Sequence, residues 1–302
     1  MAAKAGVIGI GAMGMGVAKR LLARGFEVHV RDIRPEAEAE ARAAGAVVGA
    51  SPAAVARACP VVITLVVDAA QTEEVVFGPD GVAAGMRPGG VLLMCSTVSP
   101  AFSGPLAERL APRGIRVLDA PVSGGPARAL EGTMSMMIGG DAEAWEAARP
   151  VLEAISGKRF RVGPSTGDGS KMKLVNNLLA GINLAAACEG MVLGLKLGLD
   201  PRTICDVACA SSGGSWVFAD RMPRVLDGDY STRAAVDILA KDLGLALEAG
   251  AAAKALLPIG AVARQAYVAA SALGFGREDD AAVAKYYAAV SGVDLPRGER
   301  SG

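Results

Sequence analysis

The sequence predicts an α/β protein made of a Rossmann-type doubly wound sheet followed by an all-α domain. Over residues 1–165, short apolar stretches alternate with helical patterns, which is the order expected of repeated βα units. After Gly169 the strand patterns end, and Ala/Leu-rich helical patterns take over. We therefore expect one domain at 1–165 and a second at 166–302, joined by a long helix.

The individual elements follow from the periodicity of apolar residues. The chain opens with an apolar strand from Ala5, a helical stretch over Met15–Arg24 and an alternating strand over Glu27–Asp32. Further strands are predicted at 60–67, 91–95, 115–119, 133–138 and 159–162, and helices near 51–58, 70–76, 99–111 and 141–155. The second domain is predicted to contain helices at 170–197, 201–210, 234–253, 257–273 and 279–290.

The composition narrows the class of protein. Equal numbers of basic and acidic residues, 31 of each, give no general attraction for nucleic acid. No uninterrupted apolar run reaches the roughly 18 residues of a membrane span, and the first strand starts too early for a signal peptide. The five cysteines are odd in number and form no C-x-x-C, so we expect reduced thiols in a cytoplasmic protein, with no metal site. The apolar helical half, which has few aromatic residues, favours a homodimer or homotetramer.

A glycine-rich turn joins the first strand to the first helix. Gly9 allows a tight turn, Gly11 lets the backbone approach a pyrophosphate, and Gly14 lets the helix pack closely on the strand. The phosphates are expected at the N-terminus of the helix, where free N–H groups and the helix dipole favour an anion. Strand, turn, helix and second strand in this order predict that residues 1–165 bind a dinucleotide.

The second predicted strand ends on an acid, Asp32. A carboxylate at this place can accept hydrogen bonds from both hydroxyl groups of the adenosine ribose, and it repels a 2′-phosphate. We therefore predict NAD as the cofactor. Arg31 and Arg34 flank Asp32 and would soften that repulsion, so NADP stays open as an alternative.

The chain has a single histidine, His29, in the second predicted strand. Its position excludes serine and cysteine triads, which need a histidine base, as well as histidine-based hydroxyacid dehydrogenases and histidine-ligated zinc alcohol dehydrogenases. No tyrosine is followed by a lysine four residues later. If the protein is a dehydrogenase, its proton-transfer group is therefore predicted to be a lysine.

One lysine stands out in the segment 167–177, where a glycine-rich entry leads into an apolar helix. Lys173, Asn176 and Asn177 are spaced i, i+3 and i+4 and share one face, whereas Lys171 points roughly the opposite way. A lysine and two amides on an otherwise apolar helix need partners or a function. The structural alternative is a lysine whose stem is buried and whose head reaches water, beside two hydrogen-bonded amides.

A second polar segment follows the strand that ends at Asp119. Ser123, Gly124 and Gly125 form a loop at the C-terminal end of a strand, where open α/β sheets bind ligands. Successive N–H groups next to small residues can form an anion-binding nest, and the Ser123 hydroxyl adds a donor. Taken alone, this segment also fits an ordinary Ser-Gly-Gly turn.

These three segments together resemble the β-hydroxyacid dehydrogenase family, which includes 3-hydroxyisobutyrate dehydrogenase, tartronate semialdehyde reductase and, more distantly, 6-phosphogluconate dehydrogenase. The resemblance covers nearly the whole chain. It implies that Lys173 is catalytic, that Asn177 holds the substrate, and that the loop Ser123–Gly125 binds its carboxylate. It also implies cofactor contacts from Gly9, Ile10, Gly11, Ala12, Met13, Gly14, Asp32, Val66, Val67 and Thr97, and closure of Lys241 over nicotinamide and substrate.

The C-terminal half is similar to the L-threonate dehydrogenase branch, through Gly214-Ser-Trp216-Val-Phe218, Asp227-Gly-Asp-Tyr230 and Gly274-Phe-Gly-x-Glu-Asp-Asp280. The chain differs from that branch at Asn176-Asn177, where the branch carries His-Gln. The resemblance implies an L-threonate or 3-hydroxyisobutyrate dehydrogenase-like enzyme. The alternatives are 2-hydroxy-3-oxopropionate (tartronate semialdehyde) reduction and, in another class, a non-catalytic dinucleotide-binding protein. Imine reductases share the fold but typically lack the lysine.

The expected mechanism transfers a hydride between a small hydroxyacid and NAD. Neutral Lys173 takes the hydroxyl proton in oxidation and returns it in reduction. A free lysine has a pKa of about 10.4, so burial and the neighbouring charge of Lys241 are expected to lower it. Trp216 and Phe218 are expected either to select the substrate or to belong to the core.

Overall fold

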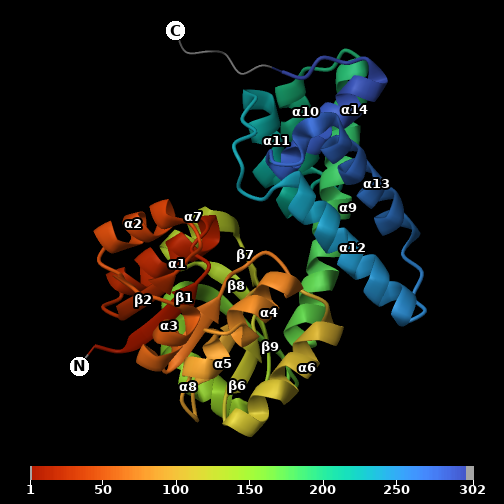
Figure 1. Cartoon of the computed structure of the whole chain (residues 1–302). Coiled ribbons are helices and arrows are strands. Elements are labelled where there is room, and N and C mark those ends of the chain that lie inside the picture. Colours follow the sequence, from red (N-terminus) through yellow and green to blue (C-terminus); the bar gives the residue numbers. More distant parts are fainter. Residues whose placement is uncertain (1, 297–302) are drawn as a thin grey trace. The chain divides into compact units, whose positions relative to one another are not determined.

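The computed structural model describes residues 2–296 and contains two compact units, Met1–Lys173 and Leu174–Gly302 (Figure 1). We call them the α/β unit and the helical unit. The division falls inside the long helix α9, Asp168–Lys196, so its first turn belongs to the α/β unit. The domain boundary after residue 165 stays a prediction from the sequence.

A nine-stranded sheet forms the centre of the α/β unit. Its strands are β1 Lys4–Ile8, β2 Glu27–Arg31, β3 Val47–Val48, β4 Val61–Thr64, β5 Val91–Met94, β6 Arg116–Asp119, β7 Val122–Ser123, β8 Met134–Gly139 and β9 Ser156–Gly163. Six parallel strands run in the order β3-β2-β1-β4-β5-β6. Strand β8 is antiparallel to β6 and β7, and β9 pairs parallel to β8. The predicted α/β class is confirmed, with an antiparallel addition at one side of the sheet.

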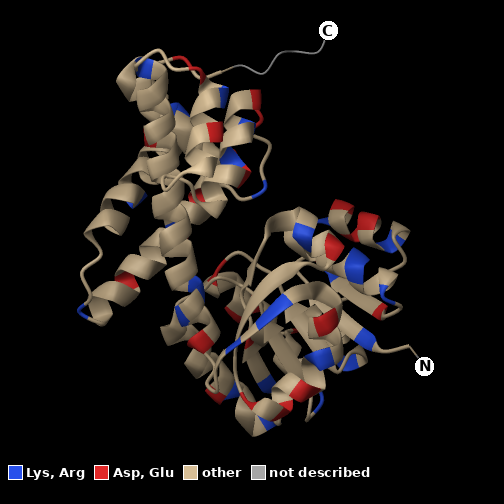
Figure 2. Ribbon diagram, turned by 180° about the vertical axis from the view of Figure 1, so that it is seen from behind, with Lys and Arg blue, Asp and Glu red and all other residues tan. Residues whose placement is uncertain are grey.

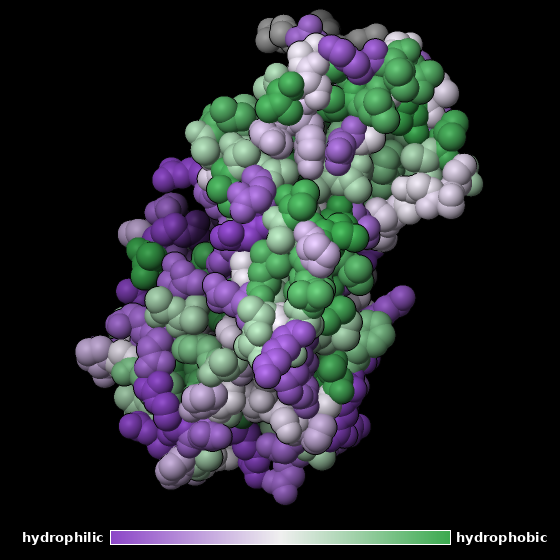
Figure 3. Space-filling view, turned by 90° about the vertical axis from the view of Figure 1, so that its right-hand side faces the viewer, coloured by the Kyte–Doolittle hydropathy of each residue, from purple (hydrophilic) through white to green (hydrophobic). Residues whose placement is uncertain are grey.

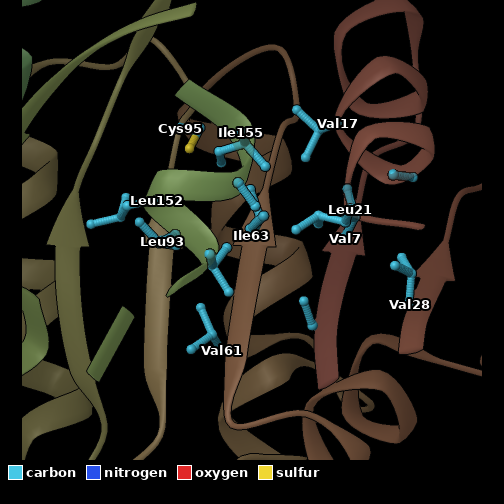
Figure 4. Packing of buried hydrophobic residues seen from close by; sticks show 14 of the residues in the cluster. Val7, Val17, Leu21, Val28, Val61, Ile63, Leu93, Cys95, Leu152 and Ile155 are labelled. Carbon is cyan, nitrogen blue, oxygen red and sulfur yellow. The ribbon is translucent and has the colours of Figure 1, made fainter. Parts of the chain in front are cut away.

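Helices cover both faces of this sheet (Figure 1): α1 Ala12–Ala23, α2 Pro35–Ala43, α3 Pro52–Ala58, α4 Ala69–Phe77, α5 Val82–Gly85, α6 Pro100–Leu110, α7 Gly125–Glu131 and α8 Ala142–Ile155. Because successive side chains of a strand point to opposite faces, the central strands feed two cores. Ile63 and Leu93 pack with Leu21 of α1 and Leu152 of α8 in one core (Figure 4), whereas Leu92 lies in the other.

The helical unit consists of the rest of α9 with α10 Pro201–Ala210, α11 Trp216–Asp227, α12 Val236–Ala252, α13 Pro258–Ala270 and α14 Val283–Ser291. Short π and 3₁₀ turns occupy Ser271–Phe275 and Asp280–Ala282. Helix α9 is long and apolar enough to cross a membrane by length and composition alone, a test that core helices of soluble proteins also pass. Its residues Leu184, Cys188 and Met191 are part of the buried core.

Helix α11 was not among the predicted helices. It begins after Ser215, whose hydroxyl accepts a hydrogen bond from the N–H of Phe218, and it contains a proline, Pro223. The serine cap favours a helix start, while the internal proline weakens the pattern that sequence reasoning uses. Phe218 is buried in the core of the helical unit, whereas 55% of Trp216 is exposed. The two aromatic residues therefore have different environments.

Candidate active site

The turn between β1 and α1 is shaped by its glycines. Gly9 has a φ of +83°, a conformation that residues with a side chain rarely adopt. A Cβ atom on Gly14 would lie 2.0 Å from the carbonyl oxygen of Gly9, so only glycine lets α1 pack this closely on the turn. A Cβ atom on Gly11 would meet only the Arg34 guanidinium among the described residues, at 3.9 Å. The backbone at Gly11 is therefore open to close approach by a ligand.

The start of α1 offers free donors. Among the described residues, no side chain caps α1 at Gly11. Four other helices of the α/β unit are capped by Ser51, Asp68, Ser99 and Asp141. Because the first N–H groups of a helix have no partner within it, the start of α1 is available to an anionic ligand.

Asp32 lies directly after β2 and is already hydrogen-bonded. It accepts the N–H of Ile10 at 2.7 Å, and the backbone N and Nε of Arg34 at 3.0 Å each. Burial alone would raise the pKa of Asp32, but these hydrogen bonds and the charge of Arg34 hold it below its usual value. Arg31 instead pairs with Glu38, which also accepts the N–H of Asp32. Of the two arginines that flank Asp32, Arg34 is therefore hydrogen-bonded to this candidate ribose-binding residue, whereas Arg31 is paired with Glu38.

A cleft of about 520 Å³ opens beside this turn, lined by Gly11, Ala12, Arg34 and Pro126 among others. Met13 follows in the first turn of α1. Val66 and Val67 come after β4, and Thr97 follows β5, at the C-terminal ends of neighbouring parallel strands. The open glycine backbone, the uncapped helix and the ionised Asp32 fit a dinucleotide that places its pyrophosphate and ribose here.

Lys173 and the loop Ser123–Gly125 lie together in the α/β unit. The Nζ of Lys173 donates a hydrogen bond to the carbonyl oxygen of Val122 at 2.8 Å, and only 8% of Lys173 is exposed. Gly124 and Gly125 have φ angles of +135° and +75°, and helix α7 begins at Gly125, the last residue of the loop that the sequence predicted over Ser123–Gly125. Lys171 is exposed and pairs with Asp168 at 2.8 Å. The two lysines therefore have different surroundings.

A buried carboxylate bonds the helical turn that carries this lysine. Asp119, at the end of β6, is fully buried and accepts two hydrogen bonds from Ser170 in the first turn of α9. The distances are 2.6 Å from the Ser170 N–H and 2.8 Å from its hydroxyl, which also contacts the Ser103 hydroxyl at 3.0 Å. Burial raises the pKa of Asp119 to about 6, although the bonds from Ser170 oppose this. The sequence predicted Asp119 only as the end of a strand. An acidic residue at the end of an apolar strand was the feature that could have indicated a functional role.

In the helical unit, a second buried carboxylate organises an amide. The Nδ2 of Asn177 donates a hydrogen bond to Oδ2 of Asp242 at 2.6 Å. The Oδ1 of Asn177 accepts a hydrogen bond from Nδ2 of Asn176 at 3.0 Å. Lys241 Nζ lies 2.9 Å from Oδ1 of the same Asp242. Sequence reasoning named Asn177 and Lys241 but missed Asp242, although it follows Lys241 directly.

Other reactive side chains are dispersed. Over residues 2–296, no three His, Cys, Asp or Glu side chains are grouped so that they could hold a metal ion. Four of the five free cysteines are buried and Cys209 is exposed. Burial raises the pKa of Cys59 to about 12, so this thiol is protonated at neutral pH.

Comparison with known families agrees with this geometry. Residues 4–163 match the NAD binding domain of 6-phosphogluconate dehydrogenase, and residues 167–287 match the family described as NAD-binding of NADP-dependent 3-hydroxyisobutyrate dehydrogenase. The fold and these matches define a two-domain dehydrogenase that uses a nicotinamide dinucleotide and acts on a CH–OH group. The chain belongs to the β-hydroxyacid dehydrogenase family, as the sequence predicted.

Individual relatives match over nearly their whole length. An L-threonate dehydrogenase from Cupriavidus necator is 50% identical over 296 residues, covering 98% of this chain and 99% of the relative. A 2-(hydroxymethyl)glutarate dehydrogenase from Eubacterium barkeri is 39% identical over 297 residues, covering 98% of each chain. The crystal structure of 3-hydroxyisobutyrate dehydrogenase from Salmonella typhimurium superposes with a TM-score of 0.88 at 39% identity, covering 94% of this chain and 99% of that one.

Proposed function

We propose that this enzyme oxidises the hydroxyl group of a small β-hydroxy acid with Lys173 as the general acid and base. The observation that carries this proposal is the buried Lys173 amino group, which donates a hydrogen bond to Val122 beside the Ser123–Gly125 loop. In its neutral form, an amine can donate an N–H to a carbonyl and also accept the proton of a substrate hydroxyl. When bound, NAD supplies the hydride acceptor.

The other roles are proposed from the surroundings of each residue. Ser123, Gly124 and Gly125 would bind the substrate carboxylate through the hydroxyl and backbone N–H groups. Asn177 lies one helical turn after Lys173 on α9, and its amide is oriented by Asp242. We assign Asn177 and Lys241 to substrate binding. In the reductive direction, Lys173 would return the proton to the carbonyl oxygen of the substrate.

For the cofactor, we propose that Ile10, Gly11, Ala12 and Met13 bind the pyrophosphate and that Asp32 binds the ribose. Gly9 and Gly14 shape the turn, and Val66, Val67 and Thr97 line the cofactor from the ends of β4 and β5. Asp32 favours NAD over NADP because its negative charge repels a 2′-phosphate. Arg34 pairs with Asp32 and is half-exposed, so its positive charge weakens that repulsion. Replacing Arg34 with alanine should increase the NAD-over-NADP ratio of kcat/KM about two- to fivefold, as expected for one exposed ion pair.

L-Threonate is the first substrate candidate, and 3-hydroxyisobutyrate is the second. The 50% identical relative supports threonate, while Asn176-Asn177 differs from the pair of that branch. Steady-state rates with L-threonate, 3-hydroxyisobutyrate, L-serine, glycerate and 2-(hydroxymethyl)glutarate, each with NAD and NADP, test the proposal. Tartronate semialdehyde with NADH tests the reductive alternative. NAD binding without turnover of any acid would favour a non-catalytic dinucleotide-binding protein.

We also propose a cytoplasmic homodimer or homotetramer. Several large apolar side chains at and before α13 are exposed, including Leu256 at 94%, Ile259 at 66% and Val262 at 73%. Figure 3 shows apolar side chains gathered on one face of the molecule. Exposed apolar surface of this kind is costly in water unless a partner covers it. Light scattering on the purified protein gives the subunit number, and a monomer would contradict the proposal.

A further inference from the structure

A buried carboxylate outside the proposed reaction lies three residues before the carbonyl that holds Lys173. Asp119 accepts hydrogen bonds from Ser170, and Val122 accepts one from Lys173. Asp119 and Ser170 are 51 residues apart in the sequence, and so are Val122 and Lys173. Val122 follows Asp119 by three residues, and Lys173 follows Ser170 by three. The strand end and the first turn of α9 therefore run beside each other in fixed register.

Two contacts restrict the rotation of a helix more than one contact does. Slipping α9 by one residue would turn its side chains by about 100°, and would take Lys173 away from the loop. The bond from Lys173 to Val122 could be kept during such a movement, because the lysine stem is flexible. The Asp119 carboxylate prevents it because it holds the Ser170 backbone N–H, which is part of the helix itself.

The packing of the same turn supports this constraint. A Cβ atom on Gly169 would lie 2.2 Å from the carbonyl oxygen of Asp119 and 2.6 Å from that of Met137, so the backbone of α9 lies directly on β6 and β8. A negative charge at the start of a helix is also stabilised by the helix dipole. With a pKa of about 6, Asp119 is ionised at neutral pH and can accept both bonds from Ser170.

We propose that Asp119 is a positioning residue for catalysis, which acts by fixing the rotation of α9 so that Lys173 faces the Ser123–Gly125 loop. This inference rests on the proposed role of Lys173. Asp119 bonds Ser170 in the helical turn that carries Lys173, so its effect on the rate should pass through Lys173.

A double-mutant cycle tests the proposal. Asp119→Asn and Lys173→Ala are made singly and together, and NADH formation is measured in single turnovers with the acid that the panel turns over fastest. Asp119→Asn should slow hydride transfer about 10- to 100-fold in the native background, because small misplacements cost that much. In the Lys173→Ala background it should cost less than about twofold, since residues that act as a unit are not additive. The KM for NAD should not change.

Controls separate positioning from folding. Asp141→Asn removes a carboxylate that caps α8 through the N–H of Ala144 at 2.7 Å, and its rate should stay within about twofold of the native rate. Ser170→Ala loses the hydroxyl contact but keeps the N–H, so it should show a smaller loss that also vanishes without Lys173. If Asp119→Asn does not fold, the double-mutant cycle is made with Ser170→Ala instead.

Two results would overturn the inference. An equal loss in both backgrounds would show a general structural role, and no loss in the native background would show no role in the rate. A full rate in Lys173→Ala alone would instead refute the catalytic assignment of the lysine, and the positioning role would fall with it.

Discussion

Asp119 in the α/β unit and Asp279 in the helical unit are both buried, but different groups compensate their negative charges. Asp119 of the α/β unit is held by neutral donors, the N–H and hydroxyl of Ser170. Asp279 of the helical unit is also fully buried, but Arg224 lies 2.8 Å and Arg221 3.6 Å from its Oδ1. Charged residues are found in both units (Figure 2), so the difference concerns how each buried group is compensated.

The difference indicates separate purposes. Neutral donors leave the net charge of a carboxylate in place, whereas arginine partners cancel it and bind several elements together. Arg221 and Arg224 come from α11, and Asp279 also accepts the N–H of Arg233 from the segment before α12. We infer that the arginine network around Asp279 holds the helical unit together, and that Asp119 of the α/β unit serves the reaction.

The largest expected effect is on the rate. Lys173→Ala should lower kcat by about 10²- to 10⁴-fold, the usual contribution of a general acid or base, with NAD affinity unchanged. Lys171→Ala is the matched control, because this lysine is exposed and forms an ion pair with Asp168 in the same turn of α9. Equal losses from both lysines would contradict the assigned helix face.

The second expected effect is on stability. Asp279→Ala should lower the free energy of unfolding by about 3–5 kcal/mol, because it removes the buried carboxylate partner of Arg224, whose other carboxylate partner, Asp229, is half-exposed. The kcat per folded molecule should not change. Asp227→Ala, which removes an exposed pair with Arg202 at 3.9 Å, should cost at most about 1 kcal/mol in urea titrations. A large rate loss in folded Asp279→Ala would remove the distinction between Asp119 and Asp279.

A third prediction concerns pH. The pKa of Asp119 is raised from 3.8 to about 6 in the folded protein, so the folded state binds the proton more tightly than the unfolded state. Its stabilising contribution is complete below pH 3.8 and is lost as the pH rises through 6. The native protein should therefore lose up to about 3 kcal/mol relative to Asp119→Asn between about pH 4 and 7. Denaturant titrations at each pH measure this difference, and a constant difference would contradict it.

A fourth and smaller effect is expected on substrate affinity. Ser123→Ala should raise the KM for the acid about tenfold, the cost of one hydrogen bond to a carboxylate, while the KM for NAD stays constant. Ser135→Ala, at the paired position of β8, is the control. Equal activity of the native enzyme on a neutral alcohol would remove the carboxylate loop from the proposed site.

Local patterns explain what the sequence predicted well. The turn at Gly9–Gly14 and the helix from Asp168 are encoded by consecutive residues, so their positions follow from spacing. The α/β class and the family were predicted for the same reason. Each of these features depends on residues within about one supersecondary unit.

Features that depend on distant contacts were missed. The bond between Asp119 and Ser170 joins residues 51 positions apart, and the bond from Asn177 to Asp242 spans 65. Arg34 was recognised only as a neighbour of Asp32, because spacing does not show which way a long side chain folds. Hydrogen-bond partners of single polar residues are set by the tertiary fold, and no periodic pattern records them.

The last strand of the sheet has a consequence for how these molecules behave at high concentration. Strand β9, Ser156–Gly163, pairs with β8 alone among the described strands and is exposed along most of its length. An unpaired edge invites the strands of other molecules, which leads to aggregation. Here the edge carries Lys158, Arg159 and Arg161, all exposed, and a second copy would bring the same positive charges against them. Repulsion between these like charges therefore opposes pairing of β9 with the same strand of another molecule.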